Sequence, residues 1–547
     1  MSEGNFIQVL LPLRLDWEPY YVLEGAEVGQ RVKVALSGRS YVGVVSAVGV
    51  TPEVKGRILP AEPTSLPPVH PQEVAFWHLL SEYYLCTPGE VYKAAYPSVI
   101  RSSKPRKLPE ICGKVPDKTE LSPSRQEALE AVLEAFGKGK TVLLKGSDKT
   151  EIYLELARRT LAEGKSVLYL VPEIALSRQL EDRIKAVFPD LLVYHSAQST
   201  ATRRAVGVMV REQPATMVLG TRSALFLPHH NLGLIIVDEE HDNSYKQDSP
   251  APRYHARESA IFLGGIHGAH VLLGSATPSL ESLYNAESGL FTLVSLKSCC
   301  RPEIRIINTS AESRKNGMPG SFSLKLLAAM KETLDAEKKV LLVCRSKAAV
   351  QECEEEIQGI FPDAPVEVTT PAGARLCGSF RLIAVVMADG LLGKDDFRAD
   401  ERALQLFQLL AHNCTDLLVI QTRESSHPVF KALKEGGDAL SFLPERKAAG
   451  YPPLTRQVSI VLRDKSLKRL EYLSQVLSQE LAFLPSVMGP YPPMQEGLED
   501  EHVRLIRLML PRDRMLRQRK SAIAATVARF EKERKYAGHI VIDVDPA

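Results

Sequence analysis

Short runs of purely apolar residues, separated by helical segments, limit what this chain can fold into more than any other feature. Five of them lie at Val142–Leu144, Val167–Val171, Met217–Leu219, Leu234–Val237 and Val271–Leu273. Strands that are apolar on both faces are typical of a parallel sheet covered by helices on each side. The sequence therefore predicts a doubly wound parallel α/β lobe in this region.

The N-terminal part of the chain has a different pattern. Phe6–Leu11, Arg31–Leu36 and Tyr41–Val45 are short and rich in β-formers, and residues 37–40 have the composition of a turn. A helical stretch follows at Val74–Tyr84. We expect a small β-rich domain here.

Two further segments follow the predicted lobe. The first looks thin, because Lys339–Val343 and Leu382–Met387 are its only clear buried strands. The second alternates strands at Gln457–Leu462, Arg504–Leu510 and His539–Val544 with helices. We expect it to form a separate α+β domain.

The charge balance gives no sign of a strongly basic protein. The 547 residues carry a net charge of +2, so any nucleic-acid binding must come from local patches. One basic run, Arg101–Lys107, is equally well explained as a solvated linker or as a patch that contacts phosphates.

The sequence also bears on where the protein is located and on whether it binds zinc. Met1–Asn5 lacks the basic start of a signal peptide, and no apolar run is long enough to span a bilayer. We expect a cytoplasmic protein with no membrane partner. The eight cysteines include no Cys-x-x-Cys pair, which favours reduced thiols over a zinc site.

An acidic cluster, Asp238-Glu239-Glu240-His241, directly follows the apolar strand Leu234–Val237. The end of a parallel strand is where such sheets place their ligands. One carboxylate there can hold Mg²⁺ and the next can polarise an attacking water. The alternative is that these acids only cap a helix.

The loop Ser244–Arg257 is rich in aromatic and cationic side chains. Rings that stack on bases and cations that pair with phosphates suit contact with nucleic acid. The alternative is a loop that is simply packed into the fold.

Several segments together resemble one family. Gly274-Ser275-Ala276-Thr277 is similar to the Ser-Ala-Thr motif of superfamily 2 helicases. The wider set resembles the primosomal protein N-prime (PriA) family of such helicases. It comprises Val9–Leu13, Tyr83–Cys86, Gly89–Val91, Val171–Leu176, Gly220–Leu225, Asp238–Gln247, Pro252–Arg257, Gly274–Ser279, Glu445–Pro453 and Ile542–Pro546.

The resemblance implies roles for particular residues. ATP would be bound by Gly146, Ser147, Lys149, Thr150, Asp238 and Glu239, with Thr150 and Asp238 holding Mg²⁺ and with Lys149, Asp238 and Glu239 catalytic. DNA would be contacted by Thr221, Arg222, Tyr245, Lys246, Arg253, Tyr254 and Arg257. Ser275, Ala276 and Thr277 would couple the nucleotide site to the second lobe.

The resemblance also implies a division into domains and a set of partners. The domains are a DNA 3′-end-binding domain at 1–105, a basic linker at 106–121, helicase lobe 1 at 122–300, a reduced lobe 2 at 301–440 and a C-terminal domain at 441–547. The expected partners are forked or branched DNA and the primosome or single-strand-binding proteins.

The chain departs from the family where ATP is handled. A phosphate loop has the pattern Gly-x-x-x-x-Gly-Lys-Thr, whose backbone N–H groups wrap the phosphates. Here only Ser147 and Asp148 separate Gly146 from Lys149, and we expect the Asp148 carboxylate to oppose a triphosphate without a counter-charge. A loop of this kind is expected to bind ATP poorly.

Other family pieces are missing as well. The segment Leu409–Cys414 lacks the arginines of the last helicase motif, and Thr369–Cys377 lacks the Gly-Thr-Gln motif. The zinc insertion expected near Arg345–Glu352 and most of a winged helix before Ser122 are absent. These losses predict a PriA-like protein that binds forks and nascent 3′ ends with an impaired motor. An active ATP-dependent 3′-to-5′ helicase and a protein-binding scaffold without a DNA role are the alternatives.

Overall fold

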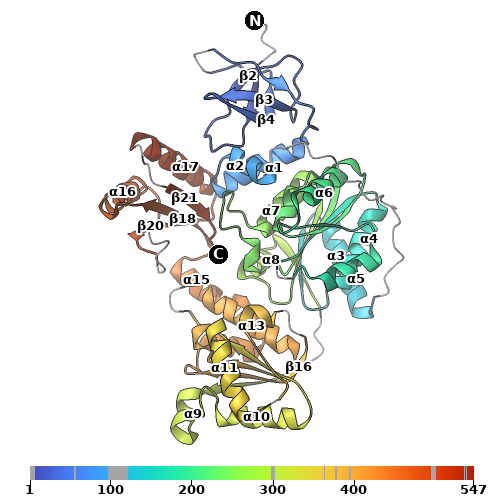
Figure 1. Ribbon diagram of the computed structural model, residues 1–547, viewed down its shortest axis with the longest axis vertical. Helices are drawn as coiled ribbons and strands as arrows, with labels where there is room; N and C mark the ends of the chain where they lie inside the picture. Colours follow the sequence, from blue (N-terminus) through green and yellow to red (C-terminus); the bar gives the residue numbers. More distant parts are fainter. Residues whose placement is uncertain are drawn as a thin grey trace.

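The protein is described by a computed structural model, in which four β-sheets follow one another along the chain (Figure 1). The described residues are 6–53, 57–96, 121–173, 175–296, 302–362, 364–375, 378–393, 396–493, 501–534, 536 and 539–546. The basic run at 101–107 lies outside them. The fold is mixed α/β, as the sequence predicted.

The first sheet is antiparallel and has the order β2-β1-β4-β3-β5. Its strands are β1 (Phe6–Leu10), β2 (Tyr20–Val22), β3 (Arg31–Leu36), β4 (Arg39–Val48) and β5 (Glu62–Pro63), followed by the helices α1 (Pro71–Tyr84) and α2 (Pro88–Ala95). Ser37 and Gly38 have φ values of 49° and 74°, as a tight hairpin turn between β3 and β4 requires. The predicted strands, turn and helix of this part are confirmed.

The second sheet is the predicted lobe, with seven parallel strands in the order β12-β6-β11-β10-β7-β9-β8. Its strands are β6 (Thr141–Lys145), β7 (Ser166–Leu170), β8 (Leu192–Tyr194), β9 (Met217–Gly220), β10 (Leu232–Asp238), β11 (His270–Ser275) and β12 (Phe291–Ser295). Its helices are α3 (Pro123–Gly137), α4 (Thr150–Ala162), α5 (Arg178–Val187), α6 (Thr200–Glu212), η1 (Arg222–Phe226), η2 (Asn243–Tyr245), α7 (Ala256–His267) and α8 (Leu280–Glu287). Helices cover both faces of the sheet, which is why its strands are apolar on both sides.

The third sheet corrects the expectation of a thin second segment. It is a five-stranded parallel sheet in the order β13-β17-β16-β14-β15. Its strands are β13 (Glu303–Asn308), β14 (Val340–Cys344), β15 (Val366–Thr369), β16 (Phe380–Val386) and β17 (Cys414–Thr422). Its helices are α9 (Thr309–Asn316), α10 (Leu324–Asp335), α11 (Lys347–Ile360), α12 (Pro371–Ala374), η3 (Ala388–Gly390), α13 (Ala399–Asn413), α14 (Pro428–Glu435), η4 (Ala439–Phe442) and α15 (Leu443–Ala449). The sequence analysis missed β17 because the strand begins with polar, exposed residues, although its second half is buried.

The fourth sheet is antiparallel, with the order β19-β20-β18-β21. It contains β18 (Thr455–Asp464), β19 (Val487–Tyr491), β20 (His502–Pro511) and β21 (His539–Val544), and it packs against α16 (Leu467–Glu480) and α17 (Leu516–Glu533). The three predicted strands of this α+β segment are confirmed, and β19 is an addition.

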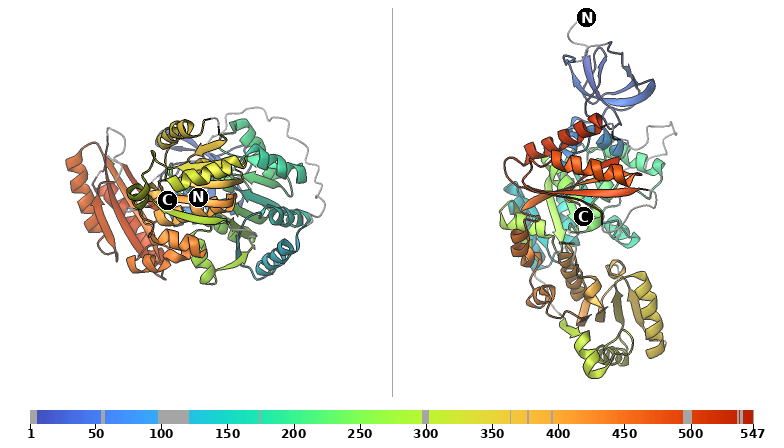
Figure 2. Two further views of the ribbon diagram at one scale, coloured as in Figure 1. Left: turned by 90° about the horizontal axis from the view of Figure 1, so that it is seen from below. Right: turned by 90° about the vertical axis from the view of Figure 1, so that its left-hand side faces the viewer.

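The β-rich domain and the third sheet lie at opposite ends of the molecule, and the second and fourth sheets lie side by side between them (Figures 1 and 2). We refer to the second and third sheets with their helices as lobe 1 and lobe 2. No helix among the described residues is both long and apolar enough to cross a membrane.

Candidate functional site: a nucleotide-type cleft

Three of the sequence motifs meet at one edge of lobe 1. The strands β6, β11 and β10 are neighbours in the sheet, and they lead into the loop at Gly146, the Ser275–Thr277 motif and the acidic cluster, respectively. Because the strands are parallel, their carboxyl ends lie at the same edge. The sequence prediction that these motifs form one site is consistent with this arrangement.

Lys149 lies at the centre of this site and is engaged by protein groups. Its Nζ is 2.9 Å from Glu239 Oε1 and 3.6 Å from Asp238 Oδ1, and it donates to the Gly146 carbonyl at 3.1 Å. Only 6% of Lys149 is exposed. Burial acts to lower the pKa of Lys149, but the two carboxylates outweigh it and raise the pKa above its usual value. The residue is a buried ammonium that already has its counter-charges.

Two tyrosines that the sequence analysis did not single out complete the site. Tyr153 donates its hydroxyl to Asp238 Oδ1 at 3.0 Å, and Tyr169 donates to Asp238 Oδ2 at 3.4 Å. Burial raises the pKa of both phenols well above the usual value, so both remain donors. Tyr153 is one helical turn after Lys149 on the same face, a spacing from which the sequence alone could have indicated it.

The short loop after β6 has a geometry of its own. Asp148 has φ 54° and its side chain is 74% exposed, with Arg125 Nη2 4.0 Å away. The expectation of a carboxylate directed at the site without a counter-charge is therefore wrong, because the left-handed turn directs Asp148 outward. Leu296 closes over Gly146: a Cβ on this glycine would lie 2.7 Å from the Leu296 side chain.

A cavity of about 450 Å³ lies between this loop and lobe 2. Lobe 1 contributes Lys145, Gly146, Ser147, Ala276 and Thr277 to its wall, and lobe 2 contributes Ile304, Gln408, Ala411, His412, Leu433, Gly436 and Gly437. Lys145 is paired with Asp438 at 2.6 Å. No arginine is among the described residues that line this cavity, so the side that faces the loop offers no guanidinium to a phosphate.

The Ser-Ala-Thr motif connects the acidic cluster to lobe 2. Ser275 Oγ lies 2.8 Å from His241 Nδ1 and accepts the Thr277 N–H at 2.9 Å. The Thr277 carbonyl accepts from Gln405 Nε2 of α13 at 3.2 Å. A path of hydrogen bonds through Ser275 and Thr277 thus connects His241 to Gln405 of lobe 2.

Glu401 of α13 joins lobe 2 to lobe 1 in a buried position. Its Oε1 accepts the Leu280 N–H at 2.9 Å, and its Oε2 lies 3.2 Å from Arg446 Nη2. Burial and the nearby charge of Glu281 raise the pKa of Glu401 to about 7. This carboxyl group therefore favours the protonated form more strongly in the folded protein than in the unfolded chain.

The raised pKa predicts a pH-dependent stability. Because the folded-state value of about 7 exceeds the usual 4.5, the contribution of Glu401 is complete below pH 4.5 and is lost as the pH rises through 7. Glu401→Gln should gain stability over wild type as the pH rises through this window, by up to about 3 kcal/mol. Urea unfolding of both proteins at several pH values measures this, with the exposed Glu367→Gln as control. Parallel pH profiles for wild type and Glu401→Gln would contradict it.

Arg257 and Glu240 form a buried ionic cluster. Arg257 Nη1 donates to Glu240 Oε2 at 2.9 Å, and its Nη2 lies 2.6 Å from Glu258. Glu240 is fully buried and also accepts from the N–H of Ser279 at 2.7 Å. The predicted contact of Arg257 with DNA is therefore at odds with the structure, because its guanidinium is already paired inside lobe 1.

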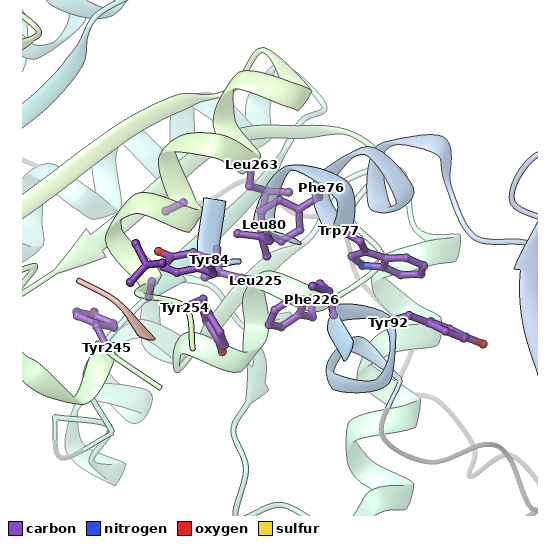
Figure 3. Packing of buried hydrophobic residues seen from close by; sticks show 14 of the residues in the cluster. Phe76, Trp77, Leu80, Tyr84, Tyr92, Leu225, Phe226, Tyr245, Tyr254 and Leu263 are labelled. Atoms are coloured by element: carbon purple, nitrogen blue, oxygen red, sulfur yellow. The ribbon is translucent and has the colours of Figure 1, made fainter. Parts of the chain in front are cut away.

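The loop Ser244–Arg257 is packed into the fold. Tyr245 and Tyr254 are each 1% exposed, and both belong to the cluster of buried residues that α1 and η1 share (Figure 3). The Tyr254 ring meets Phe226 edge-on at 5.1 Å, and the Tyr245 hydroxyl donates to the Asp238 carbonyl at 2.6 Å. Stacking of these rings on bases is excluded in this conformation, and the alternative of a packed loop is the one observed.

Lys246 and Arg222 hold this loop in place. Lys246 is 2% exposed, donates to the carbonyls of Arg253 and Val544, and lies 2.8 Å from Asp543. Arg222 Nη1 donates to the carbonyls of Ser244 and Lys246 at 2.5 and 2.7 Å. Lys246 thus joins lobe 1 to β21, whereas Arg222 holds the loop within lobe 1.

The remaining predicted DNA contacts differ in accessibility. Thr221 is 2% exposed, whereas the Arg253 side chain is 19% exposed and lies 3.6 Å from Asp543. Of the seven predicted residues, Arg222 and Arg253 are the ones whose side chains keep appreciable exposure. Among the described residues, no group of three or more His, Cys, Asp or Glu has an arrangement suited to a metal ion.

Comparison with known proteins agrees with this architecture. Residues 122–286 match the DEAD/DEAH box helicase family, and residues 8–97 match the 3′DNA-binding domain (3′BD) family. The replication restart protein PriA of Rickettsia conorii is 28% identical, over 77% of this chain and 81% of that protein. That of Treponema pallidum is 26% identical, over 85% and 87%, respectively.

A third relative matches a shorter part of the chain more closely. The replication restart protein PriA of Bacillus subtilis is 37% identical over 254 residues, which are 43% of this chain and 31% of that protein. The two matched domains cover most of the β-rich domain with its helices and most of lobe 1. The chain is therefore similar to the replication restart protein PriA over most of its length, with residues 8–97 matching a 3′DNA-binding domain and residues 122–286 matching a DEAD/DEAH box helicase domain.

Proposed function

We propose that the protein recognises forked or branched DNA and nascent 3′ ends during replication restart, and that it does so without a working ATP motor. The domain at 1–105 would take the 3′ end, lobes 1 and 2 at 122–300 and 301–440 would form the body that receives the fork, and the domain at 441–547 would brace it. Primosome and single-strand-binding proteins would be its protein partners, in a cytoplasmic setting.

One observation carries the proposal: the loop that begins at Gly146 is too short to wrap a triphosphate. A triphosphate needs successive backbone N–H groups around it, and here only Ser147 and Asp148 are available before Lys149. Leu296 lies against Gly146, and Lys149 is paired with Asp238 and Glu239. These features count against a fit of ATP·Mg²⁺ to the residues present.

The opposite lobe supports the same conclusion. Transfer of a phosphoryl group relies on an arginine from the second lobe or from a partner, whose loss lowers the rate on the order of 10³-fold or more. The described lining of the cavity beside the loop includes no arginine. Arg398, which precedes α13, is paired with Glu281 at 3.1 Å and donates to the Pro546 carbonyl at 2.7 Å.

Steady-state ATP hydrolysis with and without forked DNA tests the proposal, on protein shown to bind the fork by fluorescence anisotropy. We expect no DNA-stimulated turnover, and Lys149→Ala should leave the background rate unchanged. Lys138→Ala, at an exposed lysine whose side chain is 66% accessible, is the matched control. DNA-stimulated turnover that disappears in Lys149→Ala would instead establish the active helicase. Weak binding without preference for forks would favour the scaffold.

A further inference from the structure

A second cavity, of about 340 Å³, lies where the β-rich domain meets lobe 1. Its walls come from Arg31 at the start of β3, from Ala95 and Tyr96 at the end of α2, from one face of α6 and from Phe226–Pro228, which begins with the last residue of η1. It shares no lining residue with the cavity between the lobes. The two cavities are therefore separate sites.

The charges around this cavity are predominantly positive. Arg31, Arg203, Arg204 and Arg211 line it, and Glu212 is the acidic residue among its lining. Arg211 is partly neutralised by Glu73, which lies 3.5 Å away. Arg31 and Arg203 outnumber Glu212, so the cavity is complementary to an anion.

Arg31 provides the strongest evidence that this cavity binds a ligand. It is 5% exposed, and its Nε is buried without a hydrogen-bond partner among the described residues. Its guanidinium carbon lies 4.2 Å above the centre of the Tyr96 ring. A buried donor without an acceptor is unfavourable, and an anionic oxygen in the cavity would relieve it.

The other walls suit a flat ring. Tyr96, Tyr194 and Phe226 line the cavity together with aliphatic groups of Leu66 and Val208. The Tyr96 ring is fixed in position, because its hydroxyl donates to Glu73 Oε2 at 2.6 Å and accepts from Arg211 at 2.9 Å. Rigid aromatic rings next to arginines are the elements with which proteins bind single-stranded nucleic acids.

We propose that this cavity binds one nucleotide unit, with the base against the aromatic wall and the phosphate at Arg31 and Arg203. The inference rests on the DNA-binding role proposed above for the case in which the nucleotide belongs to a DNA strand. A free nucleotide has the same chemistry, and the experiment separates the two sources.

Photocrosslinking identifies the occupant. The full chain is irradiated with 5-iodo-2′-deoxyuridine 5′-monophosphate, or with a short oligothymidine that carries one 5-iododeoxyuridine, and the modified residues are mapped by mass spectrometry. We expect crosslinks to Tyr96, Tyr194 or Phe226. Labelling by the oligonucleotide alone identifies a DNA strand, and labelling by the monophosphate as well identifies a site for free nucleotides. Crosslinks confined to other residues would overturn the proposal.

Gly207 offers a variant that fills the cavity without disturbing the fold. It lines the cavity from α6, and a Cβ placed on it would have nothing within 4 Å. Leucine is also the better helix former. Gly207→Leu should reduce crosslinking at least about 10-fold, the loss expected when a ring contact worth more than 1.4 kcal/mol is removed.

Gly359→Leu is the matched control, because Gly359 lies in α11 of lobe 2 with equally open space at its Cβ. Its crosslinking should equal that of wild type, and equal crosslinking of Gly207→Leu would refute the assignment. Fork binding measured on the same samples separates the two proposals. A chain that binds forks without crosslinks in the cavity rejects this inference alone, whereas crosslinks to the monophosphate in a chain that binds no fork reject the proposed function alone.

Discussion

Tyr254→Ala should lower the stability of the protein by about 3–5 kcal/mol, the usual loss for a large aromatic side chain removed from a core. Tyr254 is 1% exposed and packs edge-on against Phe226 at 5.1 Å, between α1 and η1 (Figure 3). Deleting the ring leaves a cavity that its neighbours cannot fill. The urea midpoint of unfolding, together with hydrogen exchange of the amides in α7, measures the loss.

Two controls separate packing from a contact with DNA. Tyr254→Phe keeps the ring and should lose less than about 1.5 kcal/mol. Tyr472→Ala removes a tyrosine that is 63% exposed and should change stability by about 0.5 kcal/mol or less. If Tyr254→Ala remained as stable as wild type but lost affinity for forked DNA, the loop would contact bases after all, as the sequence suggested.

Lys246→Met should destabilise the protein by about 3 kcal/mol, because it leaves Asp543 buried with a weakened counter-charge. Lys246 is 2% exposed, lies 2.8 Å from Asp543 and donates to the Val544 carbonyl at 2.7 Å. Arg253, at 3.6 Å from Asp543, remains as a second cation, so the loss should lie at the lower end of the range for a broken buried pair. Methionine keeps the length of the side chain and removes the charge.

The effect should be local to the contact between lobe 1 and the C-terminal sheet. Hydrogen exchange in β21 and β18 should become faster in Lys246→Met, because β21 loses its anchor to the loop. Lys339→Met is the matched control: its pair with Glu367 is 3.3 Å long, and the two side chains are 67% and 50% exposed. Such surface pairs contribute about 1 kcal/mol or less. Equal losses for the two variants would show that burial of Lys246 is not what makes it matter.

Both predictions bear on how the protein is held together. Tyr254 and Lys246 belong to a loop that resembles a DNA-coupling element, yet they connect α1, lobe 1 and β21. In this conformation the buried rings of the loop are closed to direct contact with DNA.

Local patterns explain which parts of the site could be predicted. Every residue of Leu234–Val237 is apolar, so a strand formed by them must be buried on both faces, inside the sheet. Asp238 then lies at the carboxyl end of this strand, where ligands bind. The same reasoning placed Gly146 and Gly274 after apolar strands, and the structure shows that these strands are neighbours in the sheet. The composition of residues 37–40 predicted a turn, and Ser37 and Gly38 have the positive φ values of a tight hairpin.

Non-local choices explain the rest. Lys246 contacts Val544, which is 298 residues away in the chain, and the adjacent Asp543. No spacing in the sequence predicts these two contacts. From the sequence alone, Lys246 next to Tyr245 could equally well contact DNA or form a buried ion pair. Burial decides between them, and burial depends on which surfaces pack together.

The sequence by itself determined the parallel lobe and the shortening of the loop at Gly146, because these follow from periodicity and from the order of residues. The strand order of the folded sheet brought the three motifs to one edge. Only the tertiary structure decided that Asp148 points outward, that Lys149 is paired with Asp238 and Glu239, and that the loop Ser244–Arg257 is buried. It also created the cavity at Arg31 and Tyr96. These features depend on contacts between distant segments, whose energies are set by packing and desolvation rather than by neighbours along the chain.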